Sequence, residues 1–549
     1  MCTAPGDGSR SAARCTVTWM PNAPTGAGPA STRASFAIAL GTALIGLLYR
    51  LLLVPRYFGH EEEDWGNLQI ARGVAESHFT WLELEHMPGY SWAVGALTWI
   101  GVDVETSSLL VSVGAGALAV GLVGWIGARW YDSTTGLVAG LLVAFQPEAA
   151  LYSATALRES SYMALSLLGV LLCGQKRFRS GGAALSAAFL VRFNAFFSLF
   201  PALLLAAWWL RQRNPKESHG ALAAAATLGT VTAGWSLLYR LHPEGGSFRF
   251  WGGVFDKNTG GAVADLSTQE HIQAIIEAVW GLCLRVFPAH LGPAVLLCLP
   301  LGIFASWLAL RQADDEKAQR QAWLALCGLG TMGLLAATAV VSTYEWFHNL
   351  YWKWLTPSVP FIALLGVQGA RTLLRATLPA LRLPLATVLL GSTALAFTLQ
   401  TQHQVEQSAR MYGVQVITAR WIEQAYVEDI VVIADGIPAW YLNREPSDRV
   451  VISWRDPQLP DDRKSFGLFL FENRVAAVLW FREDWIGAAD KAPWLAKGEA
   501  TEAGPVTLKP VAWTHEYGMI GYAVEQAHSV RPPDRQPPAG TWFPPEETQ

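Results

Sequence analysis

The chain has 549 residues, of which 52% are hydrophobic and only 15% carry a charge. A soluble globular protein carries roughly 25% charged residues, so this composition predicts a membrane protein. The net charge of −4 gives no basis for a nucleic-acid partner. The six cysteines include no Cys-x-x-Cys pair, so neither a disulfide framework nor a zinc finger is supported.

Residues 1–33 are rich in small and polar residues and are expected to form a disordered cytoplasmic tail. The first apolar run, Ala34–Pro55, is about long enough to span a bilayer. No small-residue cleavage site follows it, so we interpret it as an anchor and not as a removed signal peptide. Residues 34–400 are expected to form a helical transmembrane domain with about eleven spans. After the first, the expected spans are Thr106–Ala128, Thr134–Tyr152, Ser161–Cys173, Gly181–Val191, Phe196–Leu210, Ala221–Arg240, Leu291–Leu310, Ala322–Val341, Leu355–Ala370 and Leu383–Leu399.

The charges in the connecting turns predict the orientation. With the N-terminus in the cytoplasm, the cytoplasmic turns would hold thirteen basic residues, and the short outer turns would hold only Arg158, Arg192 and Lys353. The positive-inside rule therefore places the C-terminal part outside. The pair of apolar runs that flank Arg192 is equally compatible with one interrupted helix. Composition and topology together suggest a bacterial inner membrane protein.

The first outer loop, residues 56–105, is the most informative stretch. Four adjacent acids, Glu61, Glu62, Glu63 and Asp64, follow the first span directly. Adjacent carboxylates repel one another and must stay solvated or bind a cation. Such a group at a membrane boundary is a candidate functional site, with a solvated acidic loop as the alternative. Pro88–Gly101 is too short to span, and its aromatic residues predict a helix that lies in the membrane interface.

From residue 401 the composition changes. Short runs of β-branched or apolar residues predict strands, and Val414–Ala425 has the periodicity of a helix. We therefore expect a small external α/β domain at residues 401–528, followed by a proline-rich disordered tail at 529–549. No catalytic motif occurs in this domain. The expected strands are Ile430–Ala434, Arg449–Ser453, Ala476–Phe481, Val506–Val511 and Gly518–Val524.

The order of these features resembles the polytopic glycosyltransferases of the C superfamily, which use lipid-phosphate-linked sugars. The resemblance is to protein O-mannosyltransferase-like and aminoarabinose-transferase-like enzymes. Three segments of the first loop carry it: the acidic pair with Trp65, the sequence Ile70–Glu76, and the turn His86–Tyr90. Later matches are Ala128–Asp132, Gln146–Ser153, Arg158-Glu159, Leu190–Asn194, and Tyr351–Trp354 with Pro357.

The resemblance covers about residues 35–400 and departs from the family pattern in two places. The family commonly has Asp followed by Glu, whereas here Glu63 precedes Asp64. Met87 stands where the family has the first proline of its turn. The register of the acidic pair, and hence which carboxylate acts, is therefore open.

The resemblance implies transfer of a sugar, with inversion, from a polyprenyl or dolichyl phosphate to an acceptor on the external face. A carboxylate would take the acceptor's proton, and a cation would hold the departing lipid phosphate. Glu63 or Asp64 is the expected base, and Arg192 and Lys353 are the expected phosphate ligands. Arg158 is a weaker third, and His86 would contact phosphate or acceptor. Glu159 would orient an acceptor, hold a metal with the first acids, or pair with Arg158.

Each assignment has a structural alternative. Arg192 or Arg158 could simply form an ion pair with Glu159. The long Lys353 side chain could extend its ammonium group to the membrane–water interface, and His86 could be an ordinary turn residue. Oxygen ligands from Glu63, Asp64 and Glu159 would suit Mg²⁺ or Mn²⁺, and the cofactor stays open. A secondary transporter and a non-catalytic membrane scaffold are the alternative functions. The sugar, the lipid length and the acceptor (glycan, lipid or protein) stay open as well.

Overall fold

The computed structural model describes residues 31–56, 63–78, 87–211, 214–241, 291–311, 356–409, 431–435, 450–481, 487–513 and 519–526, with isolated residues and short runs elsewhere within 273–331 and 413–439. Four of the described helices are long and apolar enough to cross a membrane, and further apolar helices are shorter. The chain is therefore an integral membrane protein, and the count of eleven spans stays a prediction. The predicted tails lie outside the described residues, except that the first helix already begins at Thr32.

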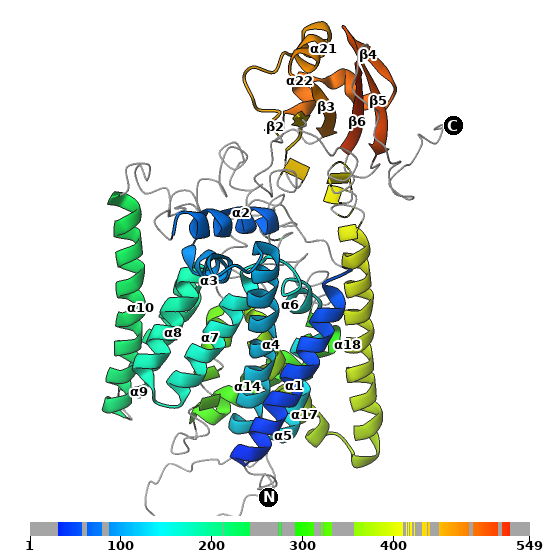
Figure 1. Cartoon of the computed structure of the whole chain (residues 1–549). Coiled ribbons are helices and arrows are strands. Elements are labelled where there is room, and N and C mark those ends of the chain that lie inside the picture. Colours follow the sequence, from blue (N-terminus) through cyan, green and yellow to red (C-terminus); the bar gives the residue numbers. More distant parts are fainter. Residues whose placement is uncertain are drawn as a thin grey trace, which may run out of the picture.

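The helices form a bundle with the N-terminal end of α1 at one side and the C-terminal sheet beyond the other (Figure 1). Small residues on α4 allow α1 and α5 to approach it closely, as is common between membrane helices. The described helices of this bundle are α1 (Thr32–Leu53), α4 (Val104–Trp130), α5 (Ser133–Phe145), α7 (Glu159–Gly174), α8 (Phe178–Val191), α9 (Asn194–Leu210), α10 (Pro215–Leu241), α14 (Pro293–Arg311), α17 (Val359–Ala376) and α18 (Pro379–Ser408).

Two shorter helices lie across the end of the bundle nearest the C-terminal sheet. They are α2 (Glu63–Glu76) and α3 (Pro88–Trp99), and α2 runs across the ends of the upright helices in Figure 1. Pro88 occupies the first turn of α3, where a missing N–H costs nothing. We call this end of the bundle, which carries α2, α3 and α6 (Pro147–Leu151), the capped face.

The predicted span Thr134–Tyr152 is wrong at its outer end. Helix α5 stops at Phe145, and α6 begins anew at Pro147. Proline has no N–H and forces the residue before it out of the helical conformation, so one helix cannot run through this point. The Gln146 side chain caps α6 by accepting a hydrogen bond of 2.6 Å from the backbone N–H of Ala149.

The break at Arg192 joins two antiparallel helices and not the halves of one interrupted helix. Arg192 itself is extended, with φ −153° and ψ 123°. A single cavity is lined by the C-terminal ends of α7 and α9 together with the N-terminal ends of α8 and α10. The chain therefore reverses between α8 and α9, which places Arg192 at the capped face together with the start of α7.

The C-terminal domain is confirmed as α/β, with a six-stranded sheet in the order β2-β1-β3-β6-β5-β4. The strand β1 pairs in parallel with β2 and β3, and the remaining neighbours are antiparallel. Each predicted strand appears in the sheet. The three-residue β4 was not predicted, since Thr501–Ala503 is too short and too polar to stand out. The strands are β1 (Val431–Ile433), β2 (Val450–Ile452), β3 (Val475–Phe481), β4 (Thr501–Ala503), β5 (Val506–Trp513) and β6 (Met519–Gln526).

Short helices in the described part of this domain include α21 (Arg463–Glu472), α22 (Ala488–Lys491) and the 3-10 helix η5 (Pro493–Lys497). The Trp454 indole stacks on Phe466 of α21 and donates a hydrogen bond of 2.7 Å to the carbonyl of Leu479 in β3. These contacts tie the helix to the sheet. The predicted helix Val414–Ala425 falls largely outside the described residues.

Candidate functional site

A buried ion pair joins Glu159 and Arg192 at the capped face. Glu159 is the first residue of α7, and its carboxylate contacts the Arg192 guanidinium between α8 and α9. The side chain of Glu159 is 0% exposed and that of Arg192 is 6% exposed. Burying two charges is costly, and ionisable residues at membrane depth are rare and commonly functional. This pairing of Arg192 with Glu159 is the structural alternative considered from the sequence. Arg158 is partly exposed at the N-cap of α7.

The turn that leads into Glu159 is bonded to the helices of the first loop. Asn67 of α2 donates a hydrogen bond of 2.9 Å to the carbonyl of Ala156, and Ser112 of α4 donates one of 3.1 Å to the carbonyl of Leu157. The Tyr90 hydroxyl of α3 lies 2.9 Å from Ser112 Oγ. Buried carbonyl groups outside helices need such partners. The turn and both first-loop helices are thereby held as one unit.

Positions 63 and 64 begin α2, one helical turn before Asn67 and Leu68. Asn67 is 2% exposed and Leu68 is 3% exposed, so both face the bundle. The backbone of positions 63 and 64 therefore lies about one helical turn from Asn67, which bonds the Ala156 turn. The side chains of Glu63 and Asp64 are outside the described residues, as are His86 and Lys353.

The turn before Tyr90 packs against the chain just before Arg192. A side chain at Gly89 would place its Cβ 2.9 Å from the carbonyl carbon and oxygen of Leu190 and 3.0 Å from the nitrogen of Val191. Real Cβ atoms do not approach backbone this closely, so only glycine fits here. The two matched segments, His86–Tyr90 and Leu190–Asn194, are thus in direct contact.

Arg50 is a fully buried cation near the capped face that the sequence analysis did not single out. Its guanidinium donates hydrogen bonds to the carbonyls of Gly46 (3.0 Å), Ala144 (3.4 Å) and Ala149 (2.9 Å). It therefore joins α1 to the end of α5 and to α6. A Cβ at Gly116 would lie 2.5 Å from Arg50 Nε, so the glycine at this position of α4 leaves space for the guanidinium. The sequence signal for a functional or structural role of Arg50 was that it is a single arginine inside an apolar run.

Glu148 of α6 is a second buried charge beside this turn, 1% exposed. Its carboxylate accepts a hydrogen bond of 2.9 Å from the Gln404 side chain and another from the Gln146 side chain. Gln404 belongs to α18, the helix that leads to the C-terminal sheet. Glu148 was not singled out from the sequence, because its partner Gln404 lies in the last span.

The metal candidates were Glu63, Asp64 and Glu159. In the described part of the chain, no group of three or more His, Cys, Asp or Glu side chains lies together. Of the candidates only the Glu159 side chain is described, and its charged partner is Arg192. The guanidinium already balances the charge that a metal ion would otherwise balance at Glu159.

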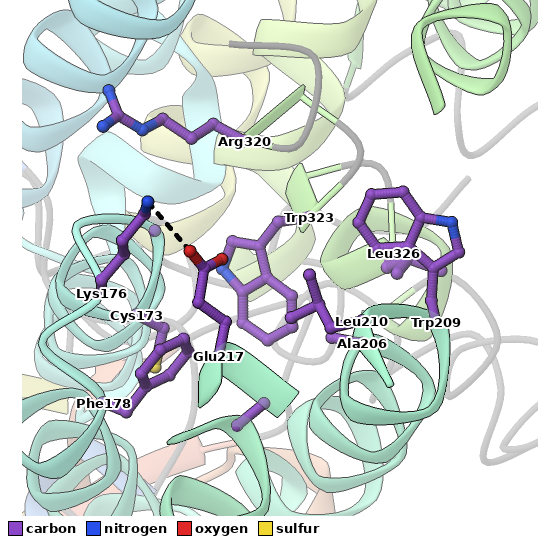
Figure 2. Close-up of a pocket in the computed structure, with 12 residues that line it drawn as sticks. Cys173, Lys176, Phe178, Ala206, Trp209, Leu210, Glu217, Arg320, Trp323 and Leu326 are labelled. Atoms are coloured by element: carbon purple, nitrogen blue, oxygen red, sulfur yellow. Dashed lines mark ion pairs between the residues drawn. The ribbon is translucent and has the colours of Figure 1, made fainter. Parts of the chain in front are cut away.

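The opposite end of the bundle holds a small cavity of about 50 Å³. Lys176 pairs with Glu217 at 2.9 Å on its wall, and Trp323 lies beside them (Figure 2). The Trp323 indole donates a hydrogen bond of 3.2 Å to the carbonyl of Val170. Because this cavity is at the far ends of α7 to α10, it is separate from the Glu159–Arg192 pair. The basic turns predicted to be cytoplasmic include Lys176.

No family model matches the chain, and no curated protein is detectably similar to it in sequence. Among solved structures, ArnT from Cupriavidus metallidurans bound to undecaprenyl phosphate is 14% identical, with a TM-score of 0.53 over 90% of this chain and 98% of that one. ArnT in the apo state is 15% identical, with a TM-score of 0.52 over 89% of this chain and 98% of that one. The archaeal oligosaccharyltransferase AglB from Archaeoglobus fulgidus, with a dolichol-phosphate, is 11% identical, with a TM-score of 0.48 over 89% and 74%.

The solved chain of ArnT is covered almost completely by this chain. The comparison therefore confirms the fold that the sequence resemblance implied. The chain shares the fold of ArnT, and in this chain that fold is a helical membrane domain followed by a C-terminal α/β domain.

Proposed function

We propose that the chain is an integral membrane glycosyltransferase that moves a sugar from a polyprenyl-phosphate donor to an acceptor at the capped face. The observation that carries this proposal is the buried Glu159–Arg192 pair, placed beside the acid-bearing start of α2 within an ArnT-like fold. The ArnT structure was solved with undecaprenyl phosphate, which is the lipid product such a transfer would release. The capped face would be the external or periplasmic face.

Arg192 is the proposed ligand of the donor phosphate. A guanidinium has five N–H donors in a planar fork, a geometry that suits the oxygens of a phosphate. We assign Glu159 to positioning: its carboxylate would hold the Arg192 fork in place, in preference to the predicted roles of acceptor ligand or metal ligand. Lys353, Arg158 and His86 remain candidate contacts to the phosphate.

Glu63 or Asp64 is the proposed general base. The carboxylate would take the proton from an acceptor hydroxyl while the hydroxyl oxygen forms a bond to the anomeric carbon. The bond from that carbon to the phosphate oxygen breaks, and the lipid phosphate leaves with its charge held by Arg192. Attack opposite to the leaving phosphate inverts the anomeric centre. Hexosyl and pentosyl donors both fit this scheme.

The role of general base is proposed for Glu63 or Asp64 because of where the start of α2 lies. The hydrogen bond from Asn67 to Ala156 fixes the first turn of α2 near the turn that ends at Glu159. A divalent cation bound by Glu63, Asp64 and Glu159 is the competing arrangement, and Mg²⁺ or Mn²⁺ would suit those oxygens. Loss of transfer in EDTA that Mg²⁺ or Mn²⁺ restores would establish the metal.

Transfer of radiolabelled sugar from undecaprenyl-phosphate donors by purified proteoliposomes tests the proposal. The comparison is wild type against Arg192→Gln, with Glu217→Gln as the matched control. Glu217 is also in an ion pair, but at the opposite end of the bundle. Transfer by the wild type and by Glu217→Gln, with a loss of about 10²-fold to 10³-fold in Arg192→Gln, is expected. If no lipid-phosphate sugar binds to the wild type, the proposal fails and a transporter or scaffold is favoured.

A further inference from the structure

An apolar slot of about 850 Å³ runs between α1, α5 and α18, outside the site described above. Its lining on α18 extends from Leu390 to Glu406, which at 1.5 Å per residue is about 24 Å. Tyr49 of α1 and Phe145 of α5 form part of the facing wall, with their ring centroids 5.0 Å apart. The slot is therefore long, narrow and mostly apolar.

The slot exists because α18 contacts the bundle through only a narrow stripe of residues. Its buried residues, Thr393, Phe397, Thr401, Gln404 and Ser408, follow one another at spacings of three and four. That spacing is a single stripe on a helix. Leu395 on α18 is 60% exposed and Leu399 is 58% exposed, as expected for a surface that faces lipid. The space beside the stripe is open to the bilayer.

One charge of each sign lines the slot near the capped face. Arg56 follows the last turn of α1, and Glu406 lies in the last turns of α18. Both are exposed, and no ion pair joins them among the described residues. The Gln402 side chain donates a hydrogen bond of 2.9 Å to Glu406 Oε1, which orients that carboxylate and leaves Oε2 available.

We propose that this slot binds a zwitterionic phospholipid of the phosphatidylethanolamine class. One acyl chain lies in the slot, the phosphate contacts Arg56, and the primary ammonium donates hydrogen bonds to Glu406. A guanidinium suits phosphate oxygens, and a carboxylate accepts from an ammonium that carries N–H groups. The quaternary ammonium of phosphatidylcholine has no N–H to donate. An anionic head group without an ammonium would face Glu406 unpaired.

The dimensions also favour a lipid chain. The slot extends about 24 Å, whereas the hydrocarbon of one leaflet is roughly 15 Å deep, so a full acyl chain fits. A lipid chain would fill the space beside the α18 stripe and steady the helix that carries Gln404 and, beyond it, the C-terminal sheet.

Native mass spectrometry of the full-length protein tests this proposal. The protein is purified in detergent with equal amounts of dioleoyl phosphatidylethanolamine, phosphatidylcholine and phosphatidylglycerol. The wild type is expected to retain one molecule of phosphatidylethanolamine, preferred by about threefold to fivefold, the size expected for an exposed ion pair. Glu406→Gln should lose the preference over phosphatidylcholine and phosphatidylglycerol, and Arg56→Gln should lower retention of all three.

Two tryptophan substitutions separate the slot from the general lipid surface. Ala394→Trp places a large ring in the slot, whereas Leu395→Trp places it on the neighbouring exposed surface. Ala394→Trp should release the lipid and Leu395→Trp should keep it, with equal thermal stability required of both. Equal retention in the two variants, or no head-group preference in the wild type, would mean ordinary surrounding lipid only. Displacement of the lipid by undecaprenyl phosphate would make the slot part of the donor site and would overturn the proposal. None of these outcomes depends on transferase activity.

Discussion

Asn67 of α2 donates a hydrogen bond of 2.9 Å to the carbonyl oxygen of Ala156, in the turn that ends at Glu159. This bond attaches the helix that begins with Glu63 and Asp64 to the buried Glu159–Arg192 pair. Removing the donor leaves a buried carbonyl without its partner, at a cost of about 1–3 kcal/mol. Asn67→Ala is therefore expected to lower the free energy of unfolding by that amount and to lower kcat at least about tenfold.

Asn473 provides the matched control for Asn67. Its side chain donates a hydrogen bond of the same length, 2.9 Å, to the carbonyl of Phe469 on the exposed surface of the C-terminal domain. Asn473→Ala should leave transfer unchanged. Thermal unfolding and steady-state transfer kinetics of the two variants measure both effects. Full activity in Asn67→Ala would show that the position of α2 is not set by this bond.

Substitutions in the Glu159–Arg192 pair can distinguish an effect on stability from an effect on transfer activity. Removing one partner of a buried pair leaves the other charge uncompensated, which typically costs about 3–5 kcal/mol. Glu159→Gln and Arg192→Gln should each be destabilised to that extent. The exchanged double variant, Glu159→Arg with Arg192→Glu, should recover much of the stability because the charges again balance. It should not recover transfer, because the cation that binds the phosphate has moved; recovery of both would contradict the role proposed for Arg192.

Gly89 tests the contact between the two matched segments. A methyl group at this position would press on Leu190 and Val191, which precede Arg192. Gly89→Ala should raise the KM for the donor several-fold, because the backbone that carries Arg192 must shift. Gly114→Ala is the control, since nothing lies within 4 Å of a Cβ at that position. Unchanged donor KM in Gly89→Ala would show that the Leu190–Asn194 segment does not depend on this packing.

Two aspartates of the C-terminal domain give opposite pH dependences. Burial raises the pKa of Asp435, and the hydrogen bonds it accepts from Ser453 and the backbone of Trp454 only partly oppose this. Between its unfolded value of roughly 3.9 and the raised folded value, the folded state binds more protons. Asp435 therefore makes the domain less stable as pH rises through that window. Asp435→Asn should remove this fall in thermal unfolding temperature.

Asp462 shows the reverse behaviour and serves as the comparison. It caps α21 by accepting hydrogen bonds from Ser465, which lowers its pKa. Its contribution to stability is present above the unfolded pKa and is lost as pH falls through the folded value. Asp462→Asn should therefore change stability only at the acidic end of the same pH series. Parallel pH profiles in the two variants would contradict both assignments.

The fold could be predicted largely from sequence because the membrane requires long apolar helices, and their limits are visible in the composition. The strands of the C-terminal domain were visible as β-branched runs. The extra break at Pro147 could have been anticipated, since a proline directly after Gln146 cannot continue α5. The sequence left two arrangements open around Arg192, two separate spans or one interrupted helix, because short apolar runs do not reveal the direction of the chain; the structure has the two spans.

The candidate site could be predicted only in part. Arg192 and Glu159 were recognised because charges are rare in such segments, but their contact depends on how α7, α8 and α9 pack. Arg50 and Glu148 were missed because their partners are backbone carbonyls and Gln404, which carry no pattern in the sequence. His86 and Lys353 lie outside the described residues, so their roles stay predictions.

The most direct measurement compares wild type, Glu63→Gln and Asp64→Asn in the proteoliposome transfer assay, with release of undecaprenyl phosphate followed as the second product. We predict that one of the two variants binds the donor normally but loses about 10²-fold to 10⁴-fold in kcat, the usual contribution of a general base. Sugar transfer and lipid phosphate release should fall together in that variant. Full transfer in both variants would contradict a first-loop carboxylate as the base and, with it, the proposed mechanism.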